Sequence, residues 1–149
     1  MELHSDGGKG MDTRLDIPTR AMRIALGVMA TLAGLDKFFN ILADWGSYVS
    51  PAAAHLLPFS PDILMGIVGV VEVAVGIAIL TALPVLGAYV ASAWLLLLAG
   101  NLAVAGYFDI AVRDVVLSIA AFTLARLIEV RDRFEAQEAP HDISLGHAA

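Results

Sequence analysis

Four long apolar stretches dominate the sequence, and one of them carries a glutamate near its centre. That stretch covers residues 63–82 and reads ILMGIVGVVEVAVGIAILTA, with Glu72 in the middle. Its length matches the roughly 20 residues that a helix needs to cross a bilayer. A carboxylate at that depth is costly, so Glu72 is the first candidate for a functional residue.

The apolar residues are collected in blocks. Of the 149 residues, 58% are hydrophobic, against about 45–50% in typical soluble domains. Blocks without a clear alternation are typical of helices that are apolar all round. The composition therefore predicts an all-α, integral membrane four-helix bundle with no separate soluble catalytic domain.

Several chemistries are excluded by the residues that the sequence lacks. It has no cysteine, so thiolate catalysis, disulfide exchange and thiolate-bound metals cannot occur. None of its four histidines lies inside an apolar stretch, which leaves no pair of axial ligands for a buried haem. We expect no metal site and no cofactor intrinsic to the chain. A nucleic-acid partner would need a basic face, and the sequence has none.

The stretches divide the chain into a membrane domain over residues 21–130 and two polar tails. Residues 1–20 form a polar tail that we expect to be flexible, and residues 131–149 form a charged C-terminal tail. Met11 is a possible alternative start, which leaves open whether residues 1–10 belong to the natural product. The predicted spans cover residues 21–42, 62–82, 85–105 and 110–130.

The distribution of Lys and Arg predicts the orientation in the membrane. With the N-terminus inside, seven of these residues fall on the inner side, and only Lys37 and Arg113 fall in the outer half. Positive charge is enriched on the cytoplasmic side of membrane proteins. We therefore expect a multi-pass protein of the inner (plasma) membrane with both termini cytoplasmic and the lipid bilayer as its first partner.

Small residues mark the helix faces that we expect to pack together, because close approach of backbones drives helix association in lipid. The second span has Gly66, Gly69 and Gly76, with Glu72 on roughly the same face. The other faces carry Gly27, Ala30 and Gly34, then Gly87 and Ala91, and finally Ser118, Ala121 and Ala125. Buried charges belong on such inward faces.

Polar residues from several spans converge on the outer half of the predicted bundle. This candidate polar pocket consists of Asp36, Lys37, Glu72, Asn101, Asp109, Arg113 and Asp114. Lys37 can reach Glu72, and Arg113 can bind Asp36 or Asp114, or pair with Asp109 at a spacing of four residues. Trp45 and Tyr48 are expected as interface anchors and Trp94 as a packing residue.

Two interpretations of this polar cluster stay open, and they do not exclude each other. The groups can form a buried network that fixes helix register. They can also line a pocket that binds a polar headgroup, a quinone ring or a proton.

Three short motifs resemble the DoxX-like family of small four-helix membrane proteins. They are GLDKF at residues 34–38, VEVAVG at residues 71–76 and DIAVRD at residues 109–114. The resemblance covers about residues 20–130. It implies the four-helix membrane fold and, by motif, carries over Lys37, Glu72 and Arg113 as candidate site residues. The family is named after a subunit of a thiosulfate:quinone oxidoreductase.

From this resemblance we expect an accessory or quinone-associated component of a membrane redox system. A bound quinone is the cofactor that such a role implies, and the partners would be other membrane redox subunits or further copies of the chain. Whether the chain is itself an enzyme stays open, since it supplies no redox group of its own. The alternatives are a structural or assembly subunit without a ligand, and a small proton-coupled transporter.

Overall fold

The computed structural model describes residues 6–56 and 58–138, and every regular element in these ranges is helical. The fold is therefore all-α, as predicted. The elements are α1 (Asp6–Asp36), the short 3-10 helix η1 (Trp45–Tyr48), α2 (Pro51–Leu56), α3 (Pro61–Leu80), α4 (Pro84–Val104) and α5 (Phe108–Glu138).

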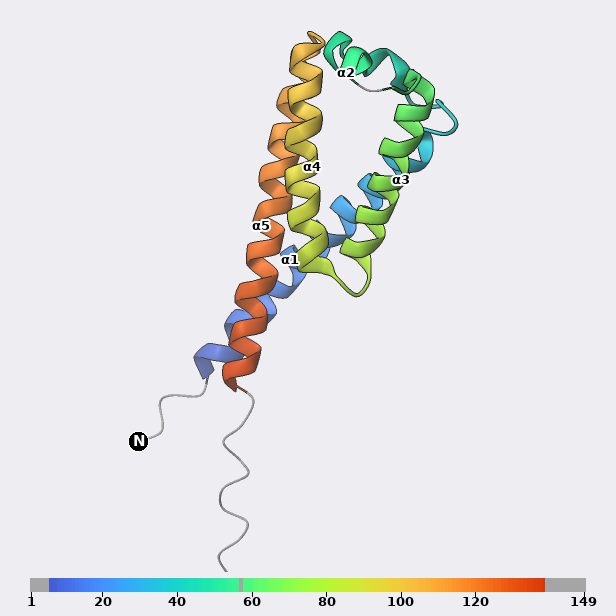
Figure 1. The fold of residues 1–149 in the computed structure, drawn as a ribbon. Coiled ribbons are helices and arrows are strands. Elements are labelled where there is room, and N and C mark those ends of the chain that lie inside the picture. The colour runs from blue at the N-terminus through green and yellow to red at the C-terminus, as the bar shows by residue number, and fades with distance from the viewer. Residues whose placement is uncertain (1–5, 57, 139–149) are drawn as a thin grey trace, which may run out of the picture.

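The long helices are arranged as two pairs. α1 packs along α3, and α4 packs along α5 (Figure 1). The pairs meet at the turn between α3 and α4 and diverge toward the opposite end, where η1 and α2 lie across the opening (Figure 1). The end of the molecule that holds the α3–α4 turn is called here the inner end, and the end with η1 and α2 the outer end.

The α1–α3 pair is held by reciprocal contacts between glycines. A Cβ atom on Gly34 would lie 2.7 Å from the carbonyl oxygen of Gly69, and a Cβ on Gly69 would lie 2.7 Å from that of Gly34. Gly76 has the same relation to Gly27, with 2.7 Å between its would-be Cβ and the Gly27 oxygen. Such distances leave no room for a side chain, so the small residues set the close approach of the two helices.

The α4–α5 pair uses alanines and one serine pair instead. Ala121 and Ala125 of α5 have no exposed surface, and Ala91 of α4 is 6% exposed. The hydroxyls of Ser92 and Ser118 lie 3.0 Å apart, and the Ser118 hydroxyl also donates to the Ser92 carbonyl oxygen at 2.8 Å. These bonds satisfy buried hydroxyls that would otherwise be costly between apolar helices.

The two ends of α3 are fixed by residues outside it. Its first turn begins with Pro61, and the Ser60 hydroxyl accepts a hydrogen bond from the Ile63 amide at 3.4 Å. At its C-terminus, the guanidinium of Arg23 from α1 donates to the carbonyl oxygens of three successive residues. The acceptors are Ile79 at 2.7 Å, Leu80 at 3.0 Å and Thr81 at 2.6 Å. Carbonyl groups at a helix C-terminus lack intrahelical hydrogen-bond donors, and the Arg23 guanidinium supplies these donors.

The helix ends differ from the predicted spans most clearly at α1. This helix ends at Asp36, six residues before the predicted end at residue 42, because the Asp36 carboxylate accepts hydrogen bonds from the amides of Ile41 and Leu42 and folds the chain back. At its other end, α1 already begins at Asp6, inside the predicted flexible tail, and continues through Pro18. α5 likewise runs on to Glu138, and residues 1–5 and 139–149 lie outside the described residues.

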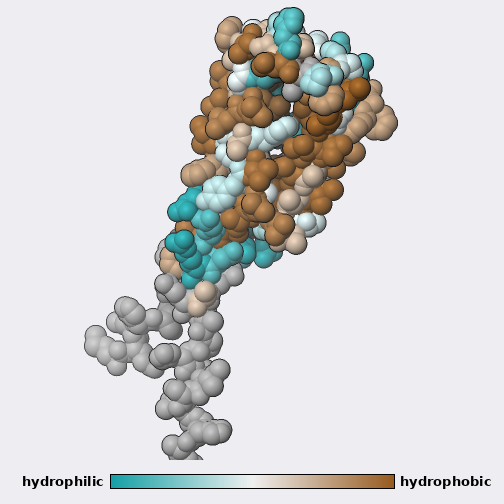
Figure 2. Space-filling view, viewed as in Figure 1, coloured by the Kyte–Doolittle hydropathy of each residue, from teal (hydrophilic) through white to brown (hydrophobic). Residues whose placement is uncertain are grey.

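Two helices, α3 and α4, are long and apolar enough to cross a membrane. Large apolar side chains are nevertheless exposed on all four long helices, such as Leu32 on α1, Val70 on α3, Leu97 on α4 and Ile119 on α5. On the face shown in Figure 2, apolar residues cover the middle of the molecule, and hydrophilic residues gather toward its ends.

The glycine contacts give a direct test of the fold. The substitution Gly34→Ala places a methyl group against backbone atoms of α3, so α1 and α3 must separate. We expect the free energy of unfolding to fall by about 1–3 kcal/mol. The matched control is Gly100→Ala on α4, where a Cβ would meet nothing within 4 Å. Thermal unfolding of both purified variants measures the difference. Equal melting temperatures would contradict the proposed role of the glycines.

Candidate ligand-binding cavity

A cavity of about 430 Å³ lies between the two helix pairs. All four long helices contribute to its wall, and Trp45 and Tyr48 of η1 line it at the outer end. Toward the inner end its walls are apolar, with side chains such as Leu26, Val75 and Ile79. The cavity is therefore apolar along most of its length and polar at one end, the general form of a ligand-binding pocket.

At the polar end, Lys37 and Glu72 form a buried ion pair. The Lys37 Nζ atom lies 2.5 Å from Glu72 Oε2, and the two side chains are only 5% and 11% exposed. Lys37 follows directly after the end of α1, and Glu72 is near the middle of α3. The predicted contact between these two residues is thus present in the structure, and the close α1–α3 packing brings them together.

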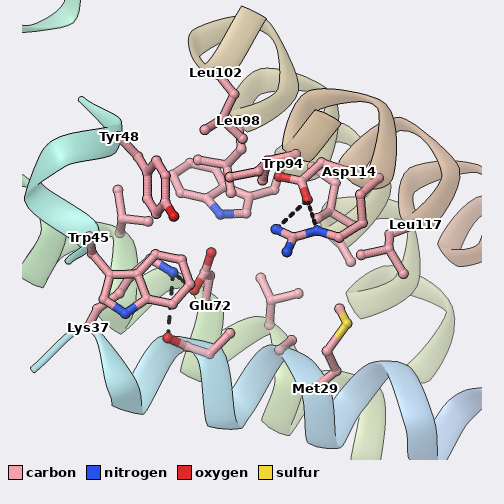
Figure 3. A pocket seen from close by; sticks show the side chains of 18 of the residues that line it. Met29, Lys37, Trp45, Tyr48, Glu72, Trp94, Leu98, Leu102, Asp114 and Leu117 are labelled. Carbon is pink, nitrogen blue, oxygen red and sulfur yellow. Dashed lines mark hydrogen bonds and ion pairs between the residues drawn. The ribbon is translucent and has the colours of Figure 1, made fainter. Parts of the chain in front are cut away.

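The ammonium of Lys37 has two further partners. Its Nζ atom lies 3.8 Å from the centroid of the Trp45 ring, which is a cation–π contact. The same atom donates to the Ala33 carbonyl oxygen at 3.5 Å. With Glu72, these contacts surround the ammonium, and Figure 3 shows Lys37 enclosed between Trp45 and Glu72.

Asp36 holds the loop that carries Trp45. Its Oδ2 atom accepts a hydrogen bond from the indole Nε1 of Trp45 at 2.7 Å, in addition to the bonds from the Ile41 and Leu42 amides. Asp36 is buried but lies behind the cavity wall rather than in it. Its role in this structure is to position the indole ring over Lys37.

A second ion pair, between Arg113 and Asp114 of α5, lies across the cavity. The Nε and Nη2 atoms of Arg113 lie 3.1 and 3.0 Å from Asp114 Oδ1. The Asp114 side chain is 6% exposed and that of Arg113 is 59% exposed. Of the partners considered for Arg113, the structure shows Asp114. Asp109 is exposed and does not line the cavity.

Asn101 ties the outer loop to α4. Its Nδ2 atom donates to the Tyr48 carbonyl oxygen at 2.8 Å, and its Oδ1 atom accepts from the Ser50 amide at 3.1 Å. The Tyr48 ring also packs edge-on against Tyr107, with 4.9 Å between the ring centroids. The loop is thereby fixed at both sides of the cavity mouth, by Asp36 on α1 and by Asn101 on α4.

Five of the seven predicted pocket residues line the cavity, while Asp36 lies just behind it and Asp109 lies outside. The five are Lys37, Glu72, Asn101, Arg113 and Asp114. Sequence reasoning assigned no site role to Trp45, Tyr48 or Trp94, which line the same cavity. The signal that could have found Trp94 is its position on the inward stripe of α4, between Ala91 and Asn101.

The indole nitrogen of Trp94 is enclosed and makes no hydrogen bond to the described residues. Buried polar groups nearly always have a partner, so this nitrogen is an exception in the cavity wall. Since it has almost no exposed surface, it offers no donor to a ligand in this conformation.

The charges of the cavity lining are balanced in pairs. Lys37 faces Glu72, and Arg113 faces Asp114, so each cation already has its own carboxylate. An anionic ligand would have to compete with these carboxylates, whereas an uncharged ligand with a polar head meets no such competition. Among the described residues, no group of three or more His, Cys, Asp or Glu is arranged to hold a metal ion.

Comparisons with protein-family models, with curated proteins and with solved structures find no match to this chain.

The buried ion pair can be tested by a double-mutant cycle. Lys37→Met or Glu72→Gln leaves the other charge buried without its partner, and each change should cost about 3–5 kcal/mol of unfolding free energy. The double variant should lose clearly less than the sum, because it leaves no lone charge. Chemical denaturation of the four proteins measures this coupling.

The pair Arg126–Glu129 on α5 provides the matched control. Its atoms also lie 2.5 Å apart, but its side chains are 50% and 25% exposed. Solvent screening should limit the corresponding coupling to about 0.2–1 kcal/mol. A Lys37–Glu72 coupling no larger than this control would contradict the structural role given to the buried pair.

Proposed function

We propose that the chain is an integral membrane protein that spans the bilayer with α1, α3, α4 and α5 and holds the headgroup of a quinone in its cavity. In this role it is an accessory component of a membrane redox system, as its likeness to the DoxX-like family implies. The observation that carries the proposal is the buried Lys37–Glu72 pair at the polar end of an otherwise apolar cavity.

The membrane placement of all four helices is supported by their outward faces. α3 and α4 satisfy length and composition criteria for spans, and α1 and α5 expose apolar side chains such as Val28, Leu32, Val116 and Phe122. The charged side chains of Lys37, Glu72 and Asp114, by contrast, are buried and paired, with the more exposed Arg113 as the partner of Asp114. Inward-facing, paired charges are the arrangement expected in a bilayer.

The cavity suits an amphipathic ligand with a flat ring. The aromatic side chains of Trp45, Tyr48 and Trp94 surround its polar end (Figure 3), and apolar side chains line the remainder. Its volume of about 430 Å³ lies within the range of small-molecule sites, roughly 300–1,000 Å³. A quinone headgroup would lie at the polar end and the first part of its apolar tail in the inner part.

Electron transfer in such a system belongs to the bound quinone and to a partner subunit. The chain contains no cysteine and therefore no thiol redox chemistry of its own. Its own residues would bind and orient the ring, and Glu72 is the group placed to exchange a proton with it.

Cell fractionation tests the membrane placement. We expect the protein in the membrane fraction, resistant to extraction by high salt and alkaline carbonate and released by detergent, because lipid would cover the apolar side chains that the four long helices expose. Because the chain has no cysteine, single cysteines introduced in place of Asp109 and Arg133 can be labelled selectively from either side of the membrane. Recovery as a monomer without detergent would contradict the proposal.

Organic extraction of the gently purified protein tests the ligand. We expect a quinone to be recovered from the wild type. The amount recovered per protein should be at least tenfold lower in Lys37→Ala, because loss of the ammonium disturbs the polar end of the cavity. The control is Arg133→Ala at an exposed position of α5, which should retain the quinone. Quinone-free preparations of folded wild type in mild detergent would count against this function.

A further inference from the structure

At the polar end of the cavity, two carboxylate oxygens have no hydrogen-bond partner among the described residues, Glu72 Oε1 and Asp114 Oδ2. Glu72 binds Lys37 through Oε2, and its Oε1 atom makes no hydrogen bond to the described residues. In Figure 3 this second oxygen points away from Lys37 toward the middle of the cavity. A carboxylate oxygen accepts hydrogen bonds and cannot donate them, so its natural partner is a hydroxyl or an amine.

Beside Glu72, the cavity offers few free donors to a carbonyl group. The Lys37 ammonium is already surrounded by Glu72, the Trp45 ring and the Ala33 carbonyl. Arg113 directs Nε and Nη2 to Asp114 and keeps Nη1 as a donor on the α5 side of the cavity, whereas the Trp94 nitrogen is enclosed. A ligand carbonyl beside Glu72 would bring its oxygen close to Glu72 Oε1. Both atoms are hydrogen-bond acceptors, so they would repel each other with no hydrogen between them.

The Tyr48 hydroxyl completes the arrangement. It points into the cavity in Figure 3, and the described residues give it no hydrogen-bond partner. A tyrosine hydroxyl can both donate and accept. A ligand hydroxyl in the cavity can therefore donate to Glu72 and accept from Tyr48 at the same time, whereas a carbonyl can only accept from Tyr48.

We infer that the cavity selects the reduced, hydroxyl-bearing form of its ligand, a hydroquinone, over the oxidised quinone. In this complex the free oxygen of Glu72 accepts a hydrogen bond from a hydroquinone hydroxyl. This inference rests on the proposed function and narrows it to one oxidation state. It concerns binding only, since no bond to hydrogen or carbon is broken.

The test compares ligands that differ in a single donor. A 4-alkylphenol and its methyl ether share their shape but differ in the hydroxyl proton, and neither changes oxidation state during the measurement. A short-chain benzoquinone and its hydroquinone, kept reduced by dithionite, form the second pair. Both tryptophans of the chain line the cavity, so their fluorescence reports binding at this site, with isothermal titration calorimetry as an independent readout.

For the detergent-purified wild type we expect the phenol and the hydroquinone to bind roughly 10- to 100-fold more tightly than the ether and the quinone, the range for a hydrogen bond to a charged group. In Glu72→Gln the discrimination should fall to within about threefold, because a side-chain amide both donates and accepts. Tyr48→Phe, which leaves the ion pair intact, should weaken binding of the phenol more than that of the ether.

The possible outcomes separate this inference from the function on which it rests. If the quinone binds as tightly as the hydroquinone and the ether as tightly as the phenol, the selection is wrong and the quinone site stands. If no probe binds to the folded wild type, the quinone site and the selection are both wrong. The wild-type comparison decides the matter even if Glu72→Gln does not fold.

Discussion

The close approach of α1 and α3 is the constraint on which the remaining structure depends. Gly34 lies against Gly69, and Gly27 against Gly76, at distances that exclude any side chain. This contact brings the residue after α1 next to the middle of α3, so that Lys37 reaches Glu72 over 2.5 Å. A larger spacing would leave both charges buried without a partner, which would be strongly unfavourable in an apolar bundle.

The cavity exists because the α4–α5 pair diverges from the α1–α3 pair instead of running parallel to it (Figure 1). α4 and α5 pack tightly through alanines and the Ser92–Ser118 bonds, and they diverge from α1 and α3 away from the α3–α4 turn (Figure 1). The loop through η1 spans the resulting opening and is held by Asp36 on one side and Asn101 on the other. The same two polar residues thus fix the loop and bring Trp45 and Tyr48 to the cavity.

The sequence was sufficient to predict the parts that depend on apolar length and on helical spacing. The predicted helices at residues 62–82 and 85–105 agree within two residues with α3 and α4, and the reach of Lys37 to Glu72 followed from the inward faces. The loop roles of Asp36 and Asn101 could not be predicted, because they depend on how the chain folds back after α1. Arg113 and Asp109 have the spacing of a helical pair, yet Arg113 binds the neighbouring Asp114, whose buried carboxylate has the greater need for a cation.

The hydrogen bonds from Arg23 have a consequence for where the α3–α4 turn can lie. Hydrocarbon contains no water, so backbone carbonyls at a helix end can enter it only if protein groups satisfy them. Arg23 bonds the last carbonyls of α3 and that of Thr81, and Pro84 begins the next helix without an amide hydrogen. In the proposed membrane placement, the hairpin would therefore be able to end short of the aqueous boundary, with α1 supplying the polar groups that lipid headgroups and water supply to longer loops.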